Sequence, residues 1–363
     1  MRARPTVVVT GITGNLGRRL LPLLHAYSVV GTDVVEPGPG VRLDRFERLD
    51  LAHESSCSSL MELLSDTRAE MLVHLAFLNH HPVGAGEAQQ IWQANVVGTA
   101  RVMEAIAAVN RAGVGPVRKF VFHSSASAYG PALPHPVDED YPLGAHTLLP
   151  AIHHQEADDV VRVRARQLGA CSTYVLRAQL LTGIPHENYL VDALRGAVSG
   201  EGMLANWLRR RGTRLPLLLP RGDQYLVKRC QFLAAADLAR LIACILRWPE
   251  SGREPVVLNV AGAGDSISIH LAARIARQKI VQLPTALACR WAYALLWNLG
   301  VSAVPPQALP YIVGNCLVDT ARIRAFLGSK YFDVIRTTSE DALQETVSAP
   351  AGQRRSVTAS ASA

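Results

Sequence analysis

Residues 10–17 read TGITGNLG, and this stretch decides the fold. It follows an apolar, β-branched run, Thr6–Thr10 (TVVVT), which predicts a buried strand, and it leads into a helical pattern. In such a unit Gly11 permits the tight turn, Gly14 lets the backbone approach a pyrophosphate, and Gly17 lets the helix pack on the sheet. The free N–H groups at the helix N-terminus then favour phosphate. The spacing predicts a dinucleotide-binding turn, with a purely structural glycine turn as the alternative.

An acidic residue, Asp33, closes the next predicted strand, Ser28–Asp33. It follows the glycines by about 20 residues, where a carboxylate accepts hydrogen bonds from the ribose hydroxyls of a bound dinucleotide. The same carboxylate repels a 2′-phosphate. The sequence therefore predicts NAD as the cofactor, preferred over NADP.

Short apolar runs alternate with longer helical patterns through the first half of the chain. This alternation predicts the α/β class: a Rossmann-type doubly wound parallel sheet covered by helices on both faces. We assign the sheet to residues 1–178 and a smaller C-terminal substrate-binding subdomain to 179–348, with some of its elements returning to the main sheet. Residues 349–363 have the composition of a disordered tail. The expected strands are 6–10, 28–33, 70–77, 117–124 and 172–177, with 215–219 and 256–260 in the subdomain; the expected helices are 16–26, 88–110 and 150–168, with 235–247 and 268–277 in the subdomain.

Composition narrows the class of protein. Of the 363 residues, 49% are hydrophobic and 18% are charged, which excludes a disordered or fibrous chain. Lys and Arg number 37 against 30 Asp and Glu, a net charge of +7. The basic residues are scattered apart from a cluster at 209–214, so we expect no nucleic-acid surface. The excess of basic residues is typical of an ordinary solvated surface, or of a protein that binds an anionic cofactor or substrate.

Cysteine and histidine usage points to no metal. The six cysteines have neither the spacing of zinc ligands nor that of a redox pair, so reduced thiols are expected. The pairs at 80–81 and 153–154 are histidines without acidic or cysteine ligands at usable spacing. The first residues carry no apolar signal segment, which predicts a cytoplasmic protein.

The segment 291–318 is uncharged and long enough to cross a bilayer. Pro305, Pro306 and Pro310 interrupt it, so we expect no transmembrane span. A buried subdomain core, an apolar substrate lid or a peripheral membrane contact through 280–318 are the remaining interpretations.

Further motifs carry a resemblance to a known family. Asp50-Leu51, His74-Leu75-Ala76-Phe77, Asn95-Val96-Val97-Gly98-Thr99 and Ser124-Ser125-Ala126-Ser127-Ala128-Tyr129-Gly130 follow the glycine turn in order. Together they resemble the extended short-chain dehydrogenases/reductases, the NAD-dependent epimerase/dehydratase group. The resemblance implies that Asn95 holds the strand carrying the active-site serine, and that this serine is Ser125. It implies these cofactor-binding residues: Gly11, Thr13, Gly14, Asn15, Leu16, Gly17, Asp33, Asp50, Leu51, Leu75, Ala76, Phe77, Asn95 and Ser124.

The acid–base pair of this family, Tyr-x-x-x-Lys, is absent. No lysine of the chain has a tyrosine four residues before it, and alignment from Ser125 puts Pro150 in the Tyr slot and His154 in the Lys slot. We therefore take Ser125 and His154 as the candidate catalytic residues. In the family the Lys holds the nicotinamide ribose and lowers the Tyr pKa. Here His154, which titrates near neutrality when unperturbed, could hold the ribose; His146, His153 or Tyr141 could serve as acid.

Three functions remain open. The first is an NAD-dependent epimerase/dehydratase-like oxidoreductase with an altered acid–base set, the second a non-redox elimination or rearrangement, and the third a catalytically degenerate NAD-binding sensor or scaffold. The expected partner is a small-molecule substrate, either apolar or a nucleotide sugar whose diphosphate the 209–214 cluster with Arg221 and Arg229 could hold. The resemblance further implies a homodimer formed through helices 88–110 and 150–168.

Overall fold

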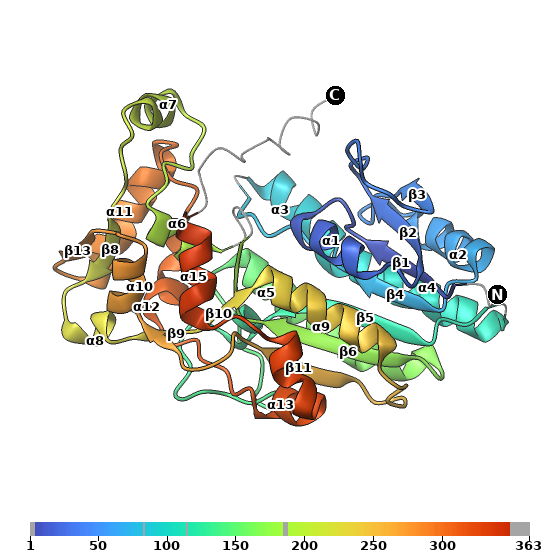
Figure 1. Ribbon diagram of the computed structural model, residues 1–363. Helices are drawn as coiled ribbons and strands as arrows, with labels where there is room; N and C mark the ends of the chain where they lie inside the picture. Colours follow the sequence, from blue (N-terminus) through green and yellow to red (C-terminus); the bar gives the residue numbers. More distant parts are fainter. Residues whose placement is uncertain (1–3, 83, 114, 184–187, 349–363) are drawn as a thin grey trace.

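The computed structural model describes residues 4–82, 84–113, 115–183 and 188–348. Its centre is a seven-stranded, wholly parallel sheet in the order β11-β6-β5-β4-β1-β2-β3 (Figure 1). The strand order reverses between β1 and β4, the point at which open α/β sheets bind ligands at their carboxyl edge. The predicted α/β, Rossmann-type fold is confirmed. The strands are β1 Thr6–Thr10, β2 Ser28–Asp33, β3 Arg45–Arg48, β4 Met71–His74, β5 Lys119–Ser125, β6 Ser172–Ala178 and β11 Val256–Val260.

Helices cover both faces of this sheet. On one face α1 (Asn15–Leu20), α9 (Ala235–Arg247) and α13 (Ala321–Leu327) share a core with the alternate residues Val7 and Val9 of β1. On the other face α2 (Ser56–Thr67), α4 (Gly98–Ala112) and α5 (Leu149–Arg164) pack against Val8. Because successive strand residues face opposite sides, a strand buried on both sides reads as a continuous apolar run, as TVVVT does.

Two predicted helices are interrupted. The pattern at 16–26 is helical only to Leu20 and continues as a 3-10 turn, Leu21–Leu23, because Pro22 lacks the N–H that an α-helix needs. The pattern at 88–110 consists of α3 (Ala85–Trp92), a π-helical turn (Gln93–Val97) and α4. The π turn contains Asn95, one of the predicted site residues.

Two elements that we placed in the subdomain belong to the main layers. Helix α9 packs on α1, and β11 pairs in parallel with β6 as an edge strand. Amphipathic patterns show that these segments are buried but not against which partner. The sequence reading also missed β3 and α2, which lie between the predicted strands 28–33 and 70–77.

The second part of the fold gathers at the left of Figure 1 and carries its own apolar core. Three two-stranded ladders, β7–β10, β8–β13 and β9–β12, form its framework.

Within the described residues, none of the helices is both long and apolar enough to cross a membrane. The tail that we predicted at 349–363 lies outside the described residues. Helix α14 (Tyr331–Val334) belongs to the core of the main sheet, beside α9. The elements of the second part are β7 Leu180–Thr182, α6 Tyr189–Arg195, α7 Met203–Arg210, β8 Leu217–Pro220, α8 Asp223–Leu226, β9 Arg229–Cys230, β10 Phe232–Ala234, β12 Ile267–Ser268, α10 Ile269–Ile275, β13 Ile280–Leu283, α11 Ala286–Asn298, α12 Leu309–Val313 and α15 Ser339–Ser348.

Candidate functional site

The glycine turn is pressed against the carboxyl end of β4. Gly11 has φ +73°, a conformation that L side chains rarely adopt, and a Cβ there would lie 2.6 Å from the backbone nitrogen of Ala76. A Cβ at Gly17 would lie 2.4 Å from the carbonyl oxygen of Ile12. Both positions therefore require glycine for the packing of strand, turn and helix.

The turn also leaves backbone donors free for a phosphate. Gly14 is the N-cap of α1 and provides no side-chain cap. The N–H groups of Asn15, Leu16 and Gly17 lie in the first turn, where a helix has no internal acceptors. With the positive end of the helix dipole behind them, these groups fit a pyrophosphate.

Asp33 ties the turn to the end of β2. Its Oδ2 accepts the Thr13 backbone N–H (3.0 Å) and the Thr13 hydroxyl (2.8 Å), while Oδ1 accepts the N–H of Val34 (2.8 Å). The half-buried carboxylate keeps acceptor positions for further donors, since a carboxylate offers about four lone-pair directions. Thr13, in contrast, directs both its hydroxyl and its N–H to Asp33.

The predicted cofactor segment Leu75–Phe77 continues from β4 along the turn. The N–H of Leu75 donates to the Thr10 carbonyl (3.1 Å), and Phe77 stacks on His154 with ring centroids 3.8 Å apart. This stack joins the strand end that borders the glycine turn to helix α5. Phe77 and His154 are distant in the sequence, so only the fold reveals their contact.

The pair Asp50-Leu51 lies beyond the end of β3. Asp50 is exposed, and its Oδ1 accepts the N–H of Ala52 (2.9 Å). Leu51 is buried, and its carbonyl accepts a hydrogen bond from Arg101 (2.9 Å). Contact between this pair and the adenine of a bound dinucleotide stays a prediction.

Asn95 does not hold the serine-bearing strand, contrary to our expectation. Its Oδ1 accepts the N–H of Leu78 (2.7 Å), and its Nδ2 donates to the carbonyl of the same residue (2.9 Å). The Nδ2 also lies 3.4 Å from Nδ1 of His153. The π turn directs this side chain to the loop after β4, so Asn95 fixes that loop rather than β5.

The side chain of Ser124 forms a hydrogen bond inside the core. Its hydroxyl donates to Asp158 Oδ2 (2.7 Å), and the residue is fully buried. Adjacent residues of a strand point to opposite faces, so Ser124 and Ser125 cannot both face one ligand with their side chains. Contact between Ser124 and the cofactor stays a prediction, and its hydroxyl proton is already donated to Asp158.

Ser125 borders a cavity of about 110 Å³ at the carboxyl edge of the sheet. Its Oγ lies 2.9 Å from the hydroxyl of Ser127. Pro150 and His154, from the first turns of α5, line the same cavity. The structure thus brings together the three positions that alignment with the family singles out. The other lining residues include Asn79, His123, Gln179, Tyr189, Tyr311 and Cys316.

His154 is a neutral imidazole with a free acceptor. Burial lowers its pKa well below the usual 6.5, and neighbouring His123 and His153 lower it further. Its Nε2 lies 3.0 Å from Oδ1 of Asn79, so this nitrogen carries the proton. The other nitrogen, Nδ1, is buried and has no partner within the described residues. The expectation that His154 titrates near neutrality is wrong, because the apolar surroundings disfavour the charged ring.

The predicted acids His146, His153 and Tyr141 do not line this cavity. His146 is exposed, and His153 is directed to Asn95. Two phenols from the later half of the chain, Tyr189 and Tyr311, line it instead. Burial raises the pKa of both, so each keeps its proton at neutral pH. The hydroxyl of Tyr189 donates to the carbonyl of Asn79 (3.3 Å) and that of Tyr311 to the carbonyl of His146 (3.2 Å). No local motif marks them; the fold alone places them there.

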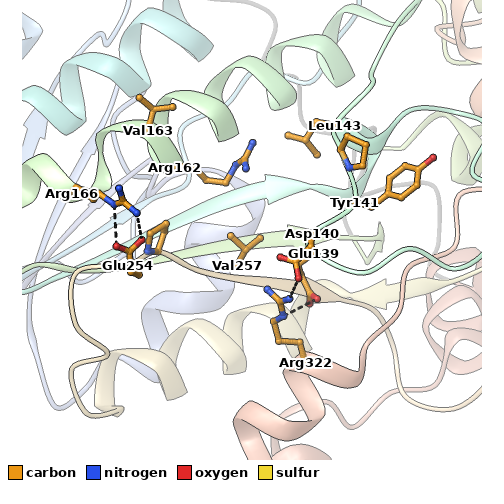
Figure 2. Close-up of a pocket in the computed structure, with 12 residues that line it drawn as sticks. Glu139, Asp140, Tyr141, Leu143, Arg162, Val163, Arg166, Glu254, Val257 and Arg322 are labelled. Carbon is orange, nitrogen blue, oxygen red and sulfur yellow. Dashed lines mark hydrogen bonds and ion pairs between the residues drawn. The ribbon is translucent and has the colours of Figure 1, made fainter.

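Tyr141 belongs to a larger hollow of about 590 Å³ between α5, β11 and α13 (Figure 2). Its charged walls neutralise each other: Arg322 pairs with Glu139 (3.2 Å) and Asp140 (2.6 Å), and Arg166 pairs with Glu254 (3.0 Å). Because these cations already have carboxylate partners, the hollow offers little attraction to an anionic ligand.

Two arginines of the 209–214 cluster donate to backbone carbonyls, and binding of a diphosphate by the cluster stays a prediction. Arg209 donates to the carbonyls of Val198 and Gly200 (3.1 and 2.8 Å), and Arg214 donates to that of Arg195 (3.0 Å). None of the cluster lines the cavity at Ser125, because α7 projects from the far end of the subdomain (Figure 1). Arg221 and Arg229 do not line it either. Among the described residues, no group of His, Cys, Asp and Glu side chains has the geometry to hold a metal ion.

Buried histidines beneath the site predict a pH-dependent stability. His74 bridges Thr10 (2.6 Å) and Thr99 (3.0 Å), and burial lowers its pKa to about 3. Burial likewise lowers the pKa of His123 to about 4. The unfolded chain takes up these protons near pH 6.5 while the folded chain does not, so acid favours unfolding. Below pH 6.5, we expect the free energy of unfolding to decrease by at most about 1.4 kcal/mol per pH unit for each such histidine.

Urea denaturation at a series of pH values measures this slope. His74→Gln should make the slope shallower below pH 6.5, because one proton no longer distinguishes the two states. The same substitution at exposed His25 is the matched control. An unchanged slope in His74→Gln would show that His74 is not the buried neutral base described.

A sequence model of the NAD dependent epimerase/dehydratase family matches residues 7–261, from the first strand to the end of β11. The chain belongs to this family. The match spans the glycine turn, Ser125 and the helix that carries His154.

Solved structures of proteins in complex with NAD share the fold. The UDP-glucose 4-epimerase of Thermus thermophilus in complex with NAD has a TM-score of 0.64 and 17% identity, with 94% of this chain and 97% of that chain covered. MoeE5 in complex with UDP-glucuronic acid and NAD has a TM-score of 0.63 and 18% identity over the same shares. A variant of UDP-glucuronic acid 4-epimerase from Bacillus cereus, in complex with NAD and a UDP-sugar derivative, has a TM-score of 0.60 and 17% identity, with 94% and 98% covered.

Proposed function

We propose that the protein is an NAD-dependent oxidoreductase of the epimerase/dehydratase type in which His154 replaces the family lysine. The observation that carries this proposal is the unpartnered, buried Nδ1 of His154, in a residue that shares a cavity with Ser125 and stacks on Phe77. A buried acceptor without a hydrogen bond is costly, which is compatible with a hydroxyl that arrives with a ligand.

The residues present fit a dinucleotide. The free N–H groups of α1 suit the pyrophosphate, and Asp33 suits the ribose hydroxyls of NAD and disfavours the 2′-phosphate of NADP. The related structures named above were determined in complex with NAD. When bound, NAD would accept or return a hydride.

Each cavity residue then has a distinct role. Nδ1 of His154 would accept a hydrogen bond from a hydroxyl of the nicotinamide ribose, and the hydroxyl of Ser125 would donate to the substrate oxygen that gains or loses the proton. The protonated phenols of Tyr189 and Tyr311 would donate to a substrate carbonyl by exchanging their present acceptors, the carbonyls of Asn79 and His146. The substrate is an apolar carbonyl compound or a nucleotide sugar, since the structural relatives bind UDP-sugars.

A second reading is an NAD-binding sensor or scaffold. Pro150 has no proton to transfer, and the cavity of about 110 Å³ is smaller than the roughly 300 Å³ at which ligand pockets of drug-sized molecules begin. A non-redox elimination on the same fold would likewise receive no proton from Pro150. For either reading we expect a cytoplasmic homodimer formed through α3–α4 and α5.

Calorimetric titration with NAD and NADP tests the cofactor, and His154→Ala tests the ribose contact. Loss of one net hydrogen bond should weaken NAD binding by about three- to tenfold. His135→Ala is the matched control, because this exposed histidine does not line the cavity. An unchanged affinity in His154→Ala would remove His154 from the site.

Turnover separates the two readings. The holoenzyme is incubated with UDP-glucose, UDP-galactose and a set of apolar ketones, and NADH absorbance and product formation are followed beside Ser125→Ala. Turnover that Ser125→Ala abolishes supports the oxidoreductase. Tight NAD binding without turnover supports the sensor, and no binding of either dinucleotide overturns both.

A further inference from the structure

Helix α11 leaves a stripe of large apolar side chains in solvent. Leu287, Trp291, Leu295 and Leu299 follow one another at intervals of four residues, which places them along one side of a helix and its end. Trp291 is 69% exposed and Leu287 is 61% exposed. The opposite side of α11 packs into the subdomain core through Cys289 and Tyr293. The helix is therefore anchored by one face and apolar on the other.

Helix α7 extends this stripe. Met203, Leu204 and Trp207 are exposed on it, Met203 by 92%. The N–H of Gly202 donates to the carbonyl of Gly300 (3.3 Å), which puts the start of α7 beside the end of the α11 stripe. Figure 1 shows α7 and α11 together at the outer end of the subdomain. We call these seven side chains the α7–α11 face; they are Met203, Leu204, Trp207, Leu287, Trp291, Leu295 and Leu299.

This concentration is unusual for a surface. The face holds seven of the twelve large apolar side chains that the described residues leave exposed. Single exposed apolar residues are ordinary, whereas a contiguous group marks an interaction site.

Cations outnumber acids around the face, where the exposed Glu201 directly precedes Gly202, the N-cap of α7. The segments 202–222 and 266–318, which contain α7 and α11, include no Asp or Glu, and their cations number nine: Arg209, Arg210, Arg211, Arg214, Arg221, Arg274, Arg277, Lys279 and Arg290. Arg211 lies over the ring of Trp207 at 3.9 Å, and Arg290 directly precedes Trp291. Arg210, Arg211 and Arg290 are exposed. Within the described part of the chain, no ion pair involves these three.

We propose that the α7–α11 face docks the protein on a membrane surface that contains anionic phospholipid. Tryptophan and leucine side chains enter the boundary between headgroups and acyl chains, while adjacent guanidinium groups bind lipid phosphates. This arrangement needs no spanning helix. A second copy of the chain fits the face poorly, because a twofold contact would bring its arginines against those of the partner.

Vesicle co-sedimentation tests the proposal with the full chain. Vesicles of equal parts phosphatidylcholine and phosphatidylglycerol should bind the protein, and vesicles of phosphatidylcholine alone should bind it at least about tenfold more weakly. High salt should release it from the anionic vesicles, since surface charges are screened.

Two variants separate the apolar and the electrostatic contributions. Trp207→Ala with Trp291→Ala, and Arg210→Glu with Arg211→Glu, should each lower binding by at least about tenfold. Phe332→Ala and Arg253→Glu are the matched controls, because both residues are exposed and lie outside the face. Circular dichroism verifies that each variant is folded.

Three outcomes would overturn the proposal. The first is equal binding to both kinds of vesicle or to neither, and the second is full binding by folded variants. The third is a dimer, seen by light scattering, that the paired tryptophan substitutions convert to a monomer, since the face would then be covered by a second copy. None of these readouts depends on NAD, so the proposed enzymatic function stands or fails separately.

Discussion

Replacing Arg177 with leucine is expected to lower the free energy of unfolding by about 3–5 kcal/mol. Arg177 lies on β6 and is 1% exposed. Its Nε and one terminal nitrogen donate to the two oxygens of Asp158 (3.0 and 2.8 Å), and Asp158 is fully buried. Removing the guanidinium takes two charge-assisted hydrogen bonds from the buried carboxylate, which keeps Ser124 and Arg162 (3.0 Å) as partners. Breaking such a buried pair costs more than the pair contributes when intact.

The same guanidinium positions the serine segment. Its second terminal nitrogen donates to the hydroxyl of Tyr129 (2.7 Å), which in turn donates to Asn259 (2.8 Å). Through Asp158 it also reaches Ser124, the neighbour of Ser125. Arg177 therefore acts as a positioning residue that joins the ends of β5, β6 and β11 to helix α5.

Urea denaturation of Arg177→Leu and of a matched control measures the effect. Arg166→Leu breaks the pair with Glu254, whose two side chains are 72% and 70% exposed, and should cost at most about 1 kcal/mol. A loss below about 1 kcal/mol in Arg177→Leu would contradict the buried network.

Replacing Asp33 with alanine is expected to weaken NAD binding by about 10- to 100-fold. The complex would lose a charge-assisted hydrogen bond between the carboxylate and the ribose, which contributes about 1.5–3 kcal/mol. Binding of NADP should fall less, because the repulsion of its 2′-phosphate disappears with the carboxylate. The ratio of the two affinities, measured by calorimetric titration, is therefore the decisive quantity.

The controls separate ribose binding from collapse of the turn. Thr13→Val removes the hydroxyl bond to Asp33 but keeps the backbone bond and the charge, so NAD should still be preferred. Asp44→Ala removes another carboxylate beside the sheet, one that binds the N–H of Val29 (2.8 Å), and should leave the affinity unchanged. An equal loss of NAD and NADP in Asp33→Ala would mean that Asp33 only holds the turn.

The charge state of His154 could not be predicted from the sequence motif around it. From the sequence, His154 is an ordinary titrating histidine in a lysine position. In the fold it stacks on Phe77 and lies near His123, and burial among these rings removes its charge. The pKa of a side chain depends on neighbours that the linear pattern does not contain.

The sequence by itself determined the strand–turn–helix unit at 6–17, the α/β class, the family and the absence of a Tyr-x-x-x-Lys pair. These follow from local spacing, because glycine conformations and strand burial leave a signature in adjacent residues. Only the tertiary structure decided that α9 and β11 join the main layers, that Asn95 holds the loop after β4, and that Tyr189 and Tyr311 replace Tyr141 beside Ser125. Each of these is a contact between segments distant in the chain, and such contacts arise from packing and burial that no single segment specifies.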